Sequence, residues 1–142
     1  MASQNYKNHA RYVPLYHFIT AAILLAVFIG SIVNLVHSSE DNRYSASLIL
    51  VISIVLIFLW RFSRSFALKA QDRAIRSEEN LRHFALTGKL LDPSLTMGQI
   101  IALRFAHDEE FVALAKKAVA EKMDSKAIKE SIQNWKSDNH RA

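Results

Sequence analysis

Two long apolar segments dominate the hydrophobic pattern of the chain. The first, VPLYHFITAAILLAVFIGSIVNLV, covers residues 13–36 without a formally charged residue, and the second, YSASLILVISIVLIFLW, covers residues 44–60. A bilayer core about 30 Å thick is crossed by roughly 20 helical residues, so each segment can span it. The pattern predicts an all-α membrane protein with a transmembrane helical hairpin at 13–66, its spans at about 13–36 and 44–62 and a short external loop at 37–43.

The second span runs into charged sequence without a helix breaker. No glycine or proline occurs between Tyr44 and Thr87, and Gly88 stands where a left-handed C-cap would end a helix. We expect one helix of roughly 65 Å, about half of it beyond the membrane. Its extramembrane part carries a small-to-apolar stripe that we expect to be buried and a charged interaction surface. The apolar stripe consists of Phe62, Phe66, Ala70, Ala74, Leu81 and Ala85. The charged surface, which we call the interaction rod, consists of Arg73, Arg76, Glu79 and Arg82, with the polar Asn80 beside them.

Residues 67–142 are predicted to form a cytoplasmic helical rod with a three-helix module. Thr96 and Gln99 have capping-box spacing, which predicts the start of the first short helix. Asp108 begins a second, with Phe111, Leu114, Ala115, Ala118 and Val119 facing inward, and Ser125 can cap a third, in which Ile128, Ile132 and Trp135 recur at helical spacing.

Basic residues near the span ends predict the orientation. Lys7 and Arg11 precede the first span, and Arg61, Arg64, Lys69, Arg73 and Arg76 follow the second, whereas the connection has only Arg43 beside two acids. The positive-inside rule places residues 1–12 and the C-terminus in the cytoplasm. We expect Lys7, Arg11, Arg61 and Arg64 to contact lipid headgroups. Tyr12, Tyr16 and Trp60 would mark the cytoplasmic interface and Tyr44 the opposite one.

A face of small residues recurs every four positions in the first span: Ala22, Ala26, Gly30 and Asn34. Such a face lets two backbones approach closely, and Asn34 could hydrogen-bond across the contact. Two interpretations are open: packing on the second span of the same chain, or an interface between subunits.

The composition of the chain excludes several kinds of chemical site. The chain has 142 residues, 51% of them hydrophobic, and no cysteine, which excludes disulfides and thiolate metal sites. Three glycines and no G-x-x-x-x-G-K-[ST] motif leave no phosphate loop. Asp72, Glu78, Glu79 and His83 could suggest an acid/base or metal set, but interleaved arginines favour salt bridges on a solvated helix. We therefore expect no enzyme activity, no metal and no cofactor.

A helix-turn-helix-like nucleic-acid-binding module is the alternative for residues 108–136, with Lys126, Lys129 and Lys136 meeting phosphates. From Ala67 onward, however, 13 Lys or Arg stand against 11 Asp or Glu. This near balance lacks the basic face of a nucleic-acid binder, so nucleic acid is not an expected partner.

Four stretches carry a resemblance to a known family: QNYKNHARYVPLYHF, QDRAIRSEENLRHFALTGKLLD, LTMGQIIALRFAHDEEFVALAKKAV and IKESIQNWKSD. Together they cover almost the whole chain, which resembles an uncharacterised family of small bacterial two-span membrane proteins, a domain of unknown function. The resemblance implies an integral membrane protein and no known activity.

These observations predict a membrane-anchored, non-enzymatic scaffold or accessory subunit that acts through helix-mediated protein contacts. We expect it in the bacterial inner (cytoplasmic) membrane as a multi-pass protein with both termini cytoplasmic. Its partners would be membrane lipids and either further copies of itself or a larger membrane protein complex.

Overall fold

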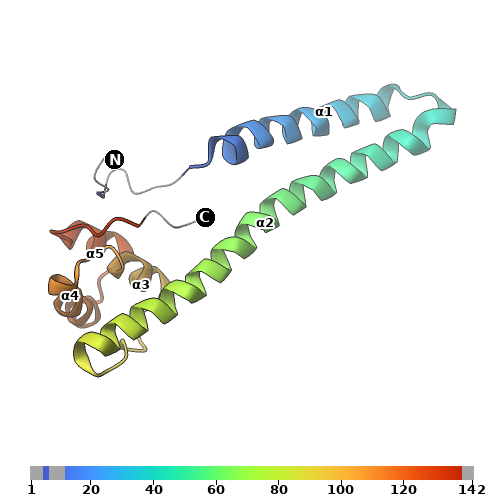
Figure 1. The fold of residues 1–142 in the computed structure, drawn as a ribbon. Coiled ribbons are helices and arrows are strands. Elements are labelled where there is room, and N and C mark those ends of the chain that lie inside the picture. Colours follow the sequence, from blue (N-terminus) through green and yellow to red (C-terminus); the bar gives the residue numbers. More distant parts are fainter. Residues whose placement is uncertain (1–4, 7–11, 139–142) are drawn as a thin grey trace. The chain divides into compact units, whose positions relative to one another are not determined.

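The computed structural model describes residues 5–6 and 12–138, and its elements are helices (Figure 1). In chain order they are the π-helical turn η1 (Leu15–Thr20), α1 (Ala21–His37), α2 (Glu40–Thr87), α3 (Met97–Leu103), α4 (Asp108–Ala120) and α5 (Ser125–Ser131). Within the described residues no strand forms. Ala106 and Trp135 make an isolated antiparallel bridge between two extended segments. The prediction of an all-α fold is confirmed for the described residues.

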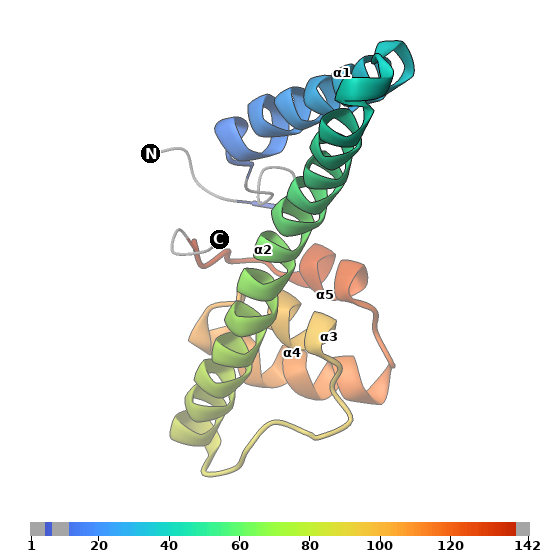
Figure 2. The ribbon, with the colours of Figure 1, turned by 90° about the vertical axis from the view of Figure 1, so that its right-hand side faces the viewer.

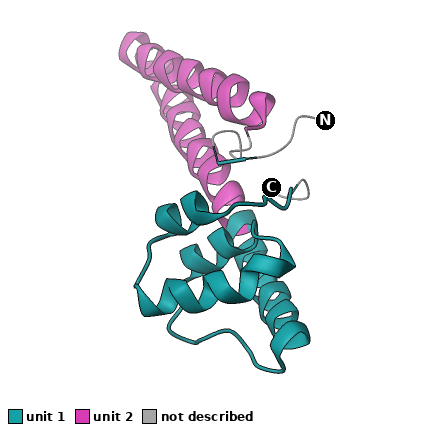
Figure 3. Ribbon diagram, turned by 90° about the vertical axis from the view of Figure 1, so that its left-hand side faces the viewer, with its two compact units in different colours: residues 1–10, 67–142 teal, residues 11–66 magenta. Residues whose placement is uncertain are grey.

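The chain divides into two compact units (Figure 3). The hairpin unit is Arg11–Phe66, and the helical unit combines Met1–Ala10 with Ala67–Ala142. Helix α2 contributes its first part to the hairpin unit and its last part to the helical unit.

Small polar residues join the two helices of the hairpin unit. Ser31 of α1 and Ser53 of α2 are buried, and their Oγ atoms lie 3.2 Å apart in a hydrogen bond. Each hydroxyl can also donate to a carbonyl one turn back in its own helix, Phe28 for Ser31 and Leu50 for Ser53, so that one serine donates across the contact while the other donates within its helix. Hydroxyls satisfied in this way can be buried without leaving a polar group unpaired. The two helices therefore meet along a seam of small side chains that also includes the buried Ala46.

Two aromatic residues, Tyr16 and Trp60, join the helices at the end of the hairpin unit away from the connection between α1 and α2. The rings of Tyr16 and Trp60 stack with their centroids 5.4 Å apart. The Trp60 Nε1–H donates to the Tyr16 carbonyl at 3.3 Å, and the Tyr16 hydroxyl donates to the Trp60 carbonyl. Tyr16 and Trp60, both predicted at the cytoplasmic membrane interface, therefore also pack α2 against the start of the first span.

The connection between α1 and α2 is shorter than the predicted loop at 37–43. Only Ser38 and Ser39 lie outside the helices, because α2 already begins at Glu40. Glu40 and Asp41 occupy its first turn, where their carboxylates interact favourably with the positive end of the helix dipole. The Asn42 side chain also donates to Ser39 Oγ at 3.2 Å. Residues read as loop from their polarity are therefore a favourable helix start.

Helix α2 has the uninterrupted course that the sequence predicts. It is continuous from Glu40 to Thr87, and Gly88 follows with φ of 72°, in the left-handed region that favours glycine. The Gly88 N–H donates to the Phe84 carbonyl at 2.7 Å. The predicted continuity from Tyr44 to Thr87 and the glycine C-cap are confirmed.

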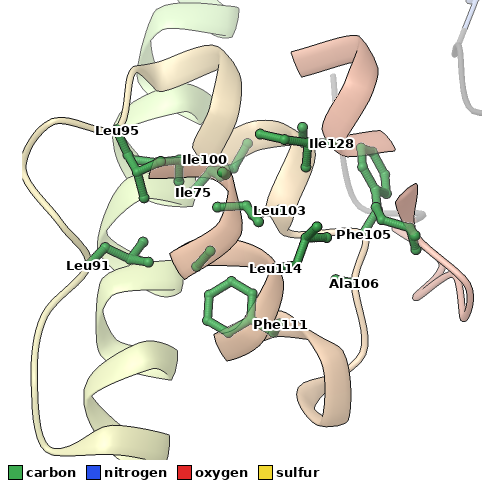
Figure 4. Close-up of a cluster of buried hydrophobic side chains, with 14 residues drawn as sticks. Ile75, Leu91, Leu95, Ile100, Leu103, Phe105, Ala106, Phe111, Leu114 and Ile128 are labelled. Carbon is green, nitrogen blue, oxygen red and sulfur yellow. The ribbon is translucent and has the colours of Figure 1, made fainter. Parts of the chain in front are cut away.

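In the helical unit, α3, α4 and α5 pack beside the end of α2 (Figure 2). Their core is built around the fully buried Phe111 of α4 and Leu103 of α3, with Ile100 of α3 and Ile128 of α5 (Figure 4). Helix α2 adds Ile75, and the loop before α3 adds Leu91 and Leu95. The predicted capping box is present, because Thr96 Oγ1 accepts from the Gln99 N–H and the Gln99 side chain accepts from the Thr96 N–H.

The last helix differs from its prediction in two ways. Asp124, and not Ser125, is the N-cap, since its carboxylate accepts from the Ala127 N–H at 2.7 Å. The helix also ends at Ser131, so Trp135 lies beyond it in extended backbone. The Glu110 carboxylate accepts the backbone N–H groups of residues 133 and 134, at 3.1 and 3.2 Å. This contact from α4 favours the extended form over another helical turn.

Candidate interaction surfaces

Arg82 is the centre of a polar cluster inside the helical unit. Its Nη1 lies 3.0 Å from Glu79 Oε2, and its Nη2 lies 2.6 Å from Asp108 Oδ1 at the start of α4. Nη2 also donates to the Ala106 carbonyl at 2.7 Å. The Arg82 and Glu79 side chains are only 12% and 8% exposed, so both charges are removed from water and satisfied by each other. The cluster joins α2 to α4.

Aromatic and electrostatic contacts reinforce this cluster. The Arg82 guanidinium lies 4.2 Å from the centroid of the buried Phe111 ring, a cation–π geometry. The hydrogen bond from Arg82 and then its charge lower the pKa of the Asp108 carboxyl below its usual value of 3.8, against a small opposing desolvation effect. Asp108 therefore stays ionised and paired with Arg82 at physiological pH.

The prediction of an exposed, charged interaction surface is therefore wrong for two of its residues, Glu79 and Arg82. Arg73 and Arg76 are exposed, but Glu79 and Arg82 point into the helical unit, because α4 supplies partners that lie 26 residues further along the sequence. The set considered for acid/base chemistry does not form a free site. Glu79 is paired with Arg82, and the buried His83 donates from Nδ1 to the Lys89 carbonyl at 2.7 Å. The interpretation of salt bridges holds for Glu79, although on a buried face and not on a solvated one.

The opposite face of α2 is exposed, which corrects the expected burial of the apolar stripe. Leu81 and Phe84 are 68% and 51% exposed. The small residues Ala67, Ala70, Ala74, Ser77 and Ala85 are exposed as well, and so are Phe62 and Phe66 at the end of the hairpin unit. The inward positions of α2 in the helical unit are instead Ile75, Glu79 and His83. An apolar helix face therefore remains without a partner in the described structure.

The small-residue face of α1 is also uncovered. Ala22, Ala26, Gly30 and Asn34 are exposed, and a Cβ added at Gly30 would meet no atom within 4 Å. The contact with α2 uses the adjacent face that carries Ser31. The interpretation of this face as intrachain packing is therefore wrong, whereas a subunit interface stays a prediction.

The residues expected at lipid headgroups are only partly described. Arg61 is exposed and Arg64 is half-buried at the end of the hairpin unit, while Lys7 and Arg11 lie outside the described residues. Two of the three lysines named for nucleic-acid binding lie near groups of the same chain. Lys126 lies 3.9 Å from Glu130, and the Lys129 Nζ is 5.9 Å from the Phe105 ring centroid.

Two open clefts lie in the helical unit. One of about 460 Å³ is lined by Ala74, Glu78, Glu79, Arg104 and the tail residues 136–138. The other is more apolar and lies between His83, the loop at 89–95 and α4. In the described residues, no group of three metal-ligating side chains converges in these clefts or elsewhere. The most extensive features available for recognition are thus helix faces.

A family model matches the chain over residues 1–142. The chain belongs to the DUF6526 family of unknown function. The resemblance to an uncharacterised family is thereby confirmed, and DUF6526 membership covers the hairpin and helical units together. Comparisons with curated proteins and with solved structures gave no match. The function of DUF6526 is unknown, so membership assigns no particular activity to this chain.

Proposed function

We propose that this protein is a membrane-anchored, non-enzymatic scaffold or accessory subunit that acts through helix-mediated protein contacts. The hairpin unit is the anchor, inserted in the bacterial inner membrane with both termini in the cytoplasm. The helical unit and the exposed faces of its helices supply the contacts with other proteins.

The observation that carries the proposal is an inversion of polarity between the two units. In the hairpin unit the buried polar residues are serines, Ser31 and Ser53, while large apolar side chains such as Phe18, Ile23 and Leu59 are more than half exposed. In the helical unit large apolar side chains are buried instead. Apolar exposure on this scale destabilises a protein in water and suits contact with lipid chains.

The two apolar helices also differ from the core helices of a water-soluble protein. Both are long and apolar enough to cross a membrane, with mean hydropathies of 2.5 and 2.3 over their most apolar windows. In the most apolar 18-residue stretch of each helix, only 6% and 11% of the residues are buried, whereas a core helix would be mostly buried. A signal sequence could account for the first helix alone, and the second continues directly into the helical unit.

The proposed scaffold role is supported by the pairing of the polar residues and by the exposed helix faces. Glu79 is paired with Arg82, which joins α2 to α4, and His83 bonds the Lys89 carbonyl, while exposed apolar and small residues form faces on α1 and α2. Helix faces of this kind bury their apolar side chains against other helices.

The orientation is tested with single cysteines, because the chain has none of its own. Ser39→Cys, in the short connection, should react with an impermeant thiol reagent on intact cells. Ser137→Cys, in the exposed tail, should react only after the membrane is opened. Labelling of Ser137→Cys but not Ser39→Cys on intact cells would reverse the orientation, and recovery of the whole chain in the soluble fraction would overturn the anchor.

The scaffold role is tested on the full chain extracted with a mild detergent. Native mass measurement should give a particle heavier than one chain, with other proteins or further copies retained, and nucleic acid and metal are assayed on the same sample. A strictly monomeric particle without partners would contradict the proposal, and salt-sensitive retention of DNA would support the nucleic-acid alternative.

A further inference from the structure

The exposed face of α2 in the helical unit has the spacing of a coiled-coil seam. Its positions alternate in steps of three and four residues and carry no charge: Ala67, Ala70, Ala74, Ser77, Leu81 and Phe84. In heptad terms, positions 67, 74 and 81 are a, and positions 70, 77 and 84 are d. We call these six residues the α2 seam. Because the repeat is 3.5 residues, the seam keeps facing a partner helix that supercoils around it.

The α2 seam is exposed in the described helical unit, although Ala74 also borders the open cleft that α2 forms with Arg104 and the tail residues 136–138. All six of its residues are exposed, with Leu81 and Phe84 the two large apolar side chains. At about 100° per residue, the inward positions Ile75, Glu79 and His83 lie on the other side of the helix. Figure 1 likewise shows α3, α4 and α5 grouped on one side of the end of α2. The core of the unit and the seam are therefore separate faces.

Charges beside the seam identify its occupant. Arg73 falls at position g and Glu78 at position e of the next heptad, and both are exposed without an ion pair in the described structure. Five residues apart on one helix, they do not face each other. In a parallel pair of identical helices, position g of one copy faces position e of the following heptad on the other. Arg73 of each copy would then meet Glu78 of its partner, twice by symmetry.

We propose that the α2 seam binds the same seam of a second copy of this chain, in parallel and in register. The inference rests on the proposed function, because insertion of both anchors in one orientation makes their α2 helices parallel. The next pair of flanking positions, Asn80 at g and Ala85 at e, places no like charges opposite each other. The small residues at 67–77 let the helices approach closely, and Leu81 with Phe84 supplies the large apolar contact.

Disulfide crosslinking of the full chain in native membranes tests this interface. Ala74→Cys, on the seam, should form a covalent dimer under mild oxidation. Arg76→Cys is the matched control, because Arg76 is also exposed and lies two residues away but points off the seam. Dimer from Ala74→Cys and none from Arg76→Cys is the expected result. Equal crosslinking at the two positions, or a disulfide adduct of Ala74→Cys with a different protein, would overturn the proposal.

Charge exchange tests the register. In the Ala74→Cys chain, Arg73→Glu places two like-charge pairs at the interface and should remove the dimer band. Adding Glu78→Arg to the same chain restores opposite charges and should bring the band back. No loss with Arg73→Glu would contradict the parallel register.

Membrane fractionation of the same cells separates the two proposals. A chain that stays in the membrane and retains other proteins, but gives no Ala74→Cys dimer, refutes the second copy and leaves the scaffold role intact. A chain that fractionates as soluble refutes the anchor, whatever its crosslinking.

Discussion

At the scale of single residues, the helical unit depends on one arginine that satisfies several groups at once. Arg82 neutralises the buried Glu79, binds Asp108 and the Ala106 carbonyl, and covers the Phe111 ring. A lysine could not reproduce this set, because its single ammonium lacks the planar fork of the guanidinium. The contact between α2 and α4 is therefore more specific than apolar packing alone.

Replacing Arg82 should destabilise the helical unit more than the same replacement of the exposed Arg76 on α2. Arg82→Met leaves the Glu79 carboxylate buried without a partner, which costs about 3–5 kcal/mol in comparable pairs. Arg76→Met, on the exposed side, should stay within about 0.5 kcal/mol. Unfolding is followed by Trp135 fluorescence in a Trp60→Phe background, and adding Glu79→Met should recover much of the loss. Equal stability of the Arg82 and Arg76 variants would contradict the role of the cluster.

The same cluster predicts how stability depends on acid. Because Arg82 lowers the folded pKa of Asp108 below 3.8, its contribution is present above that value and is lost as pH falls through the folded pKa. Arg82→Met should therefore weaken the acid dependence of unfolding in that range. Retention of the full acid dependence in Arg82→Met would assign it to other carboxylates.

At the scale of elements, α2 is the feature that local sequence signals predicted best. The absence of breakers before Gly88 gave its continuity and its end, and the Thr96–Gln99 capping box gave the start of α3. These signals act within one or two turns, so they can be read from the sequence directly. The start at Glu40 differs from the predicted loop at 37–43, because polarity alone does not distinguish a loop from the first turn of a helix.

The inward face of α2 could not be predicted in the same way. Hydrophobicity favoured the stripe with Ala74 and Leu81, but the structure buries the face with Glu79 and His83. That choice depends on partners outside α2, Asp108 for Arg82, 26 residues further along, and Lys89 just beyond the end of the helix for His83. The extended path of Trp135 likewise depends on Glu110, more than 20 residues earlier. Patterns along one helix contain no information about such partners.

A proline in α2 tests whether this helix holds the helical unit at a fixed distance from the bilayer. Ala70→Pro should kink the helix at a local cost of about 3 kcal/mol or more, without preventing insertion of the hairpin unit. Energy transfer from Trp135 to a lipid-borne acceptor, in a Trp60→Phe background, should then change. Ala70→Met, which keeps a strong helix former at the same position, is the control. An unchanged transfer efficiency in Ala70→Pro would refute the rigid spacer.

At the scale of the whole molecule, two units follow opposite rules of burial within one chain. The hairpin unit is joined by hydroxyls and small side chains and exposes apolar ones, whereas the helical unit has an apolar core with a buried ion pair. Each rule suits one solvent, because lipid gives no hydrophobic drive between helices while water does. The proposed anchor therefore leaves two faces for assembly, the small-residue face of α1 and the α2 seam.

Neighbouring residues of α1 separate assembly from hairpin packing. A Cβ added at Gly30 would meet no atom within 4 Å in one chain, so Gly30→Leu should keep the hairpin intact. Ser31→Leu removes the bond to Ser53 and overpacks a buried seam, at a cost of about 1–3 kcal/mol. If the α1 face joins subunits, Gly30→Leu should lower the native mass in mild detergent and leave thermal stability unchanged. Ser31→Leu should lower the thermal stability. An unchanged mass for Gly30→Leu would show that this face contacts lipid, and self-association would then depend on the α2 seam alone.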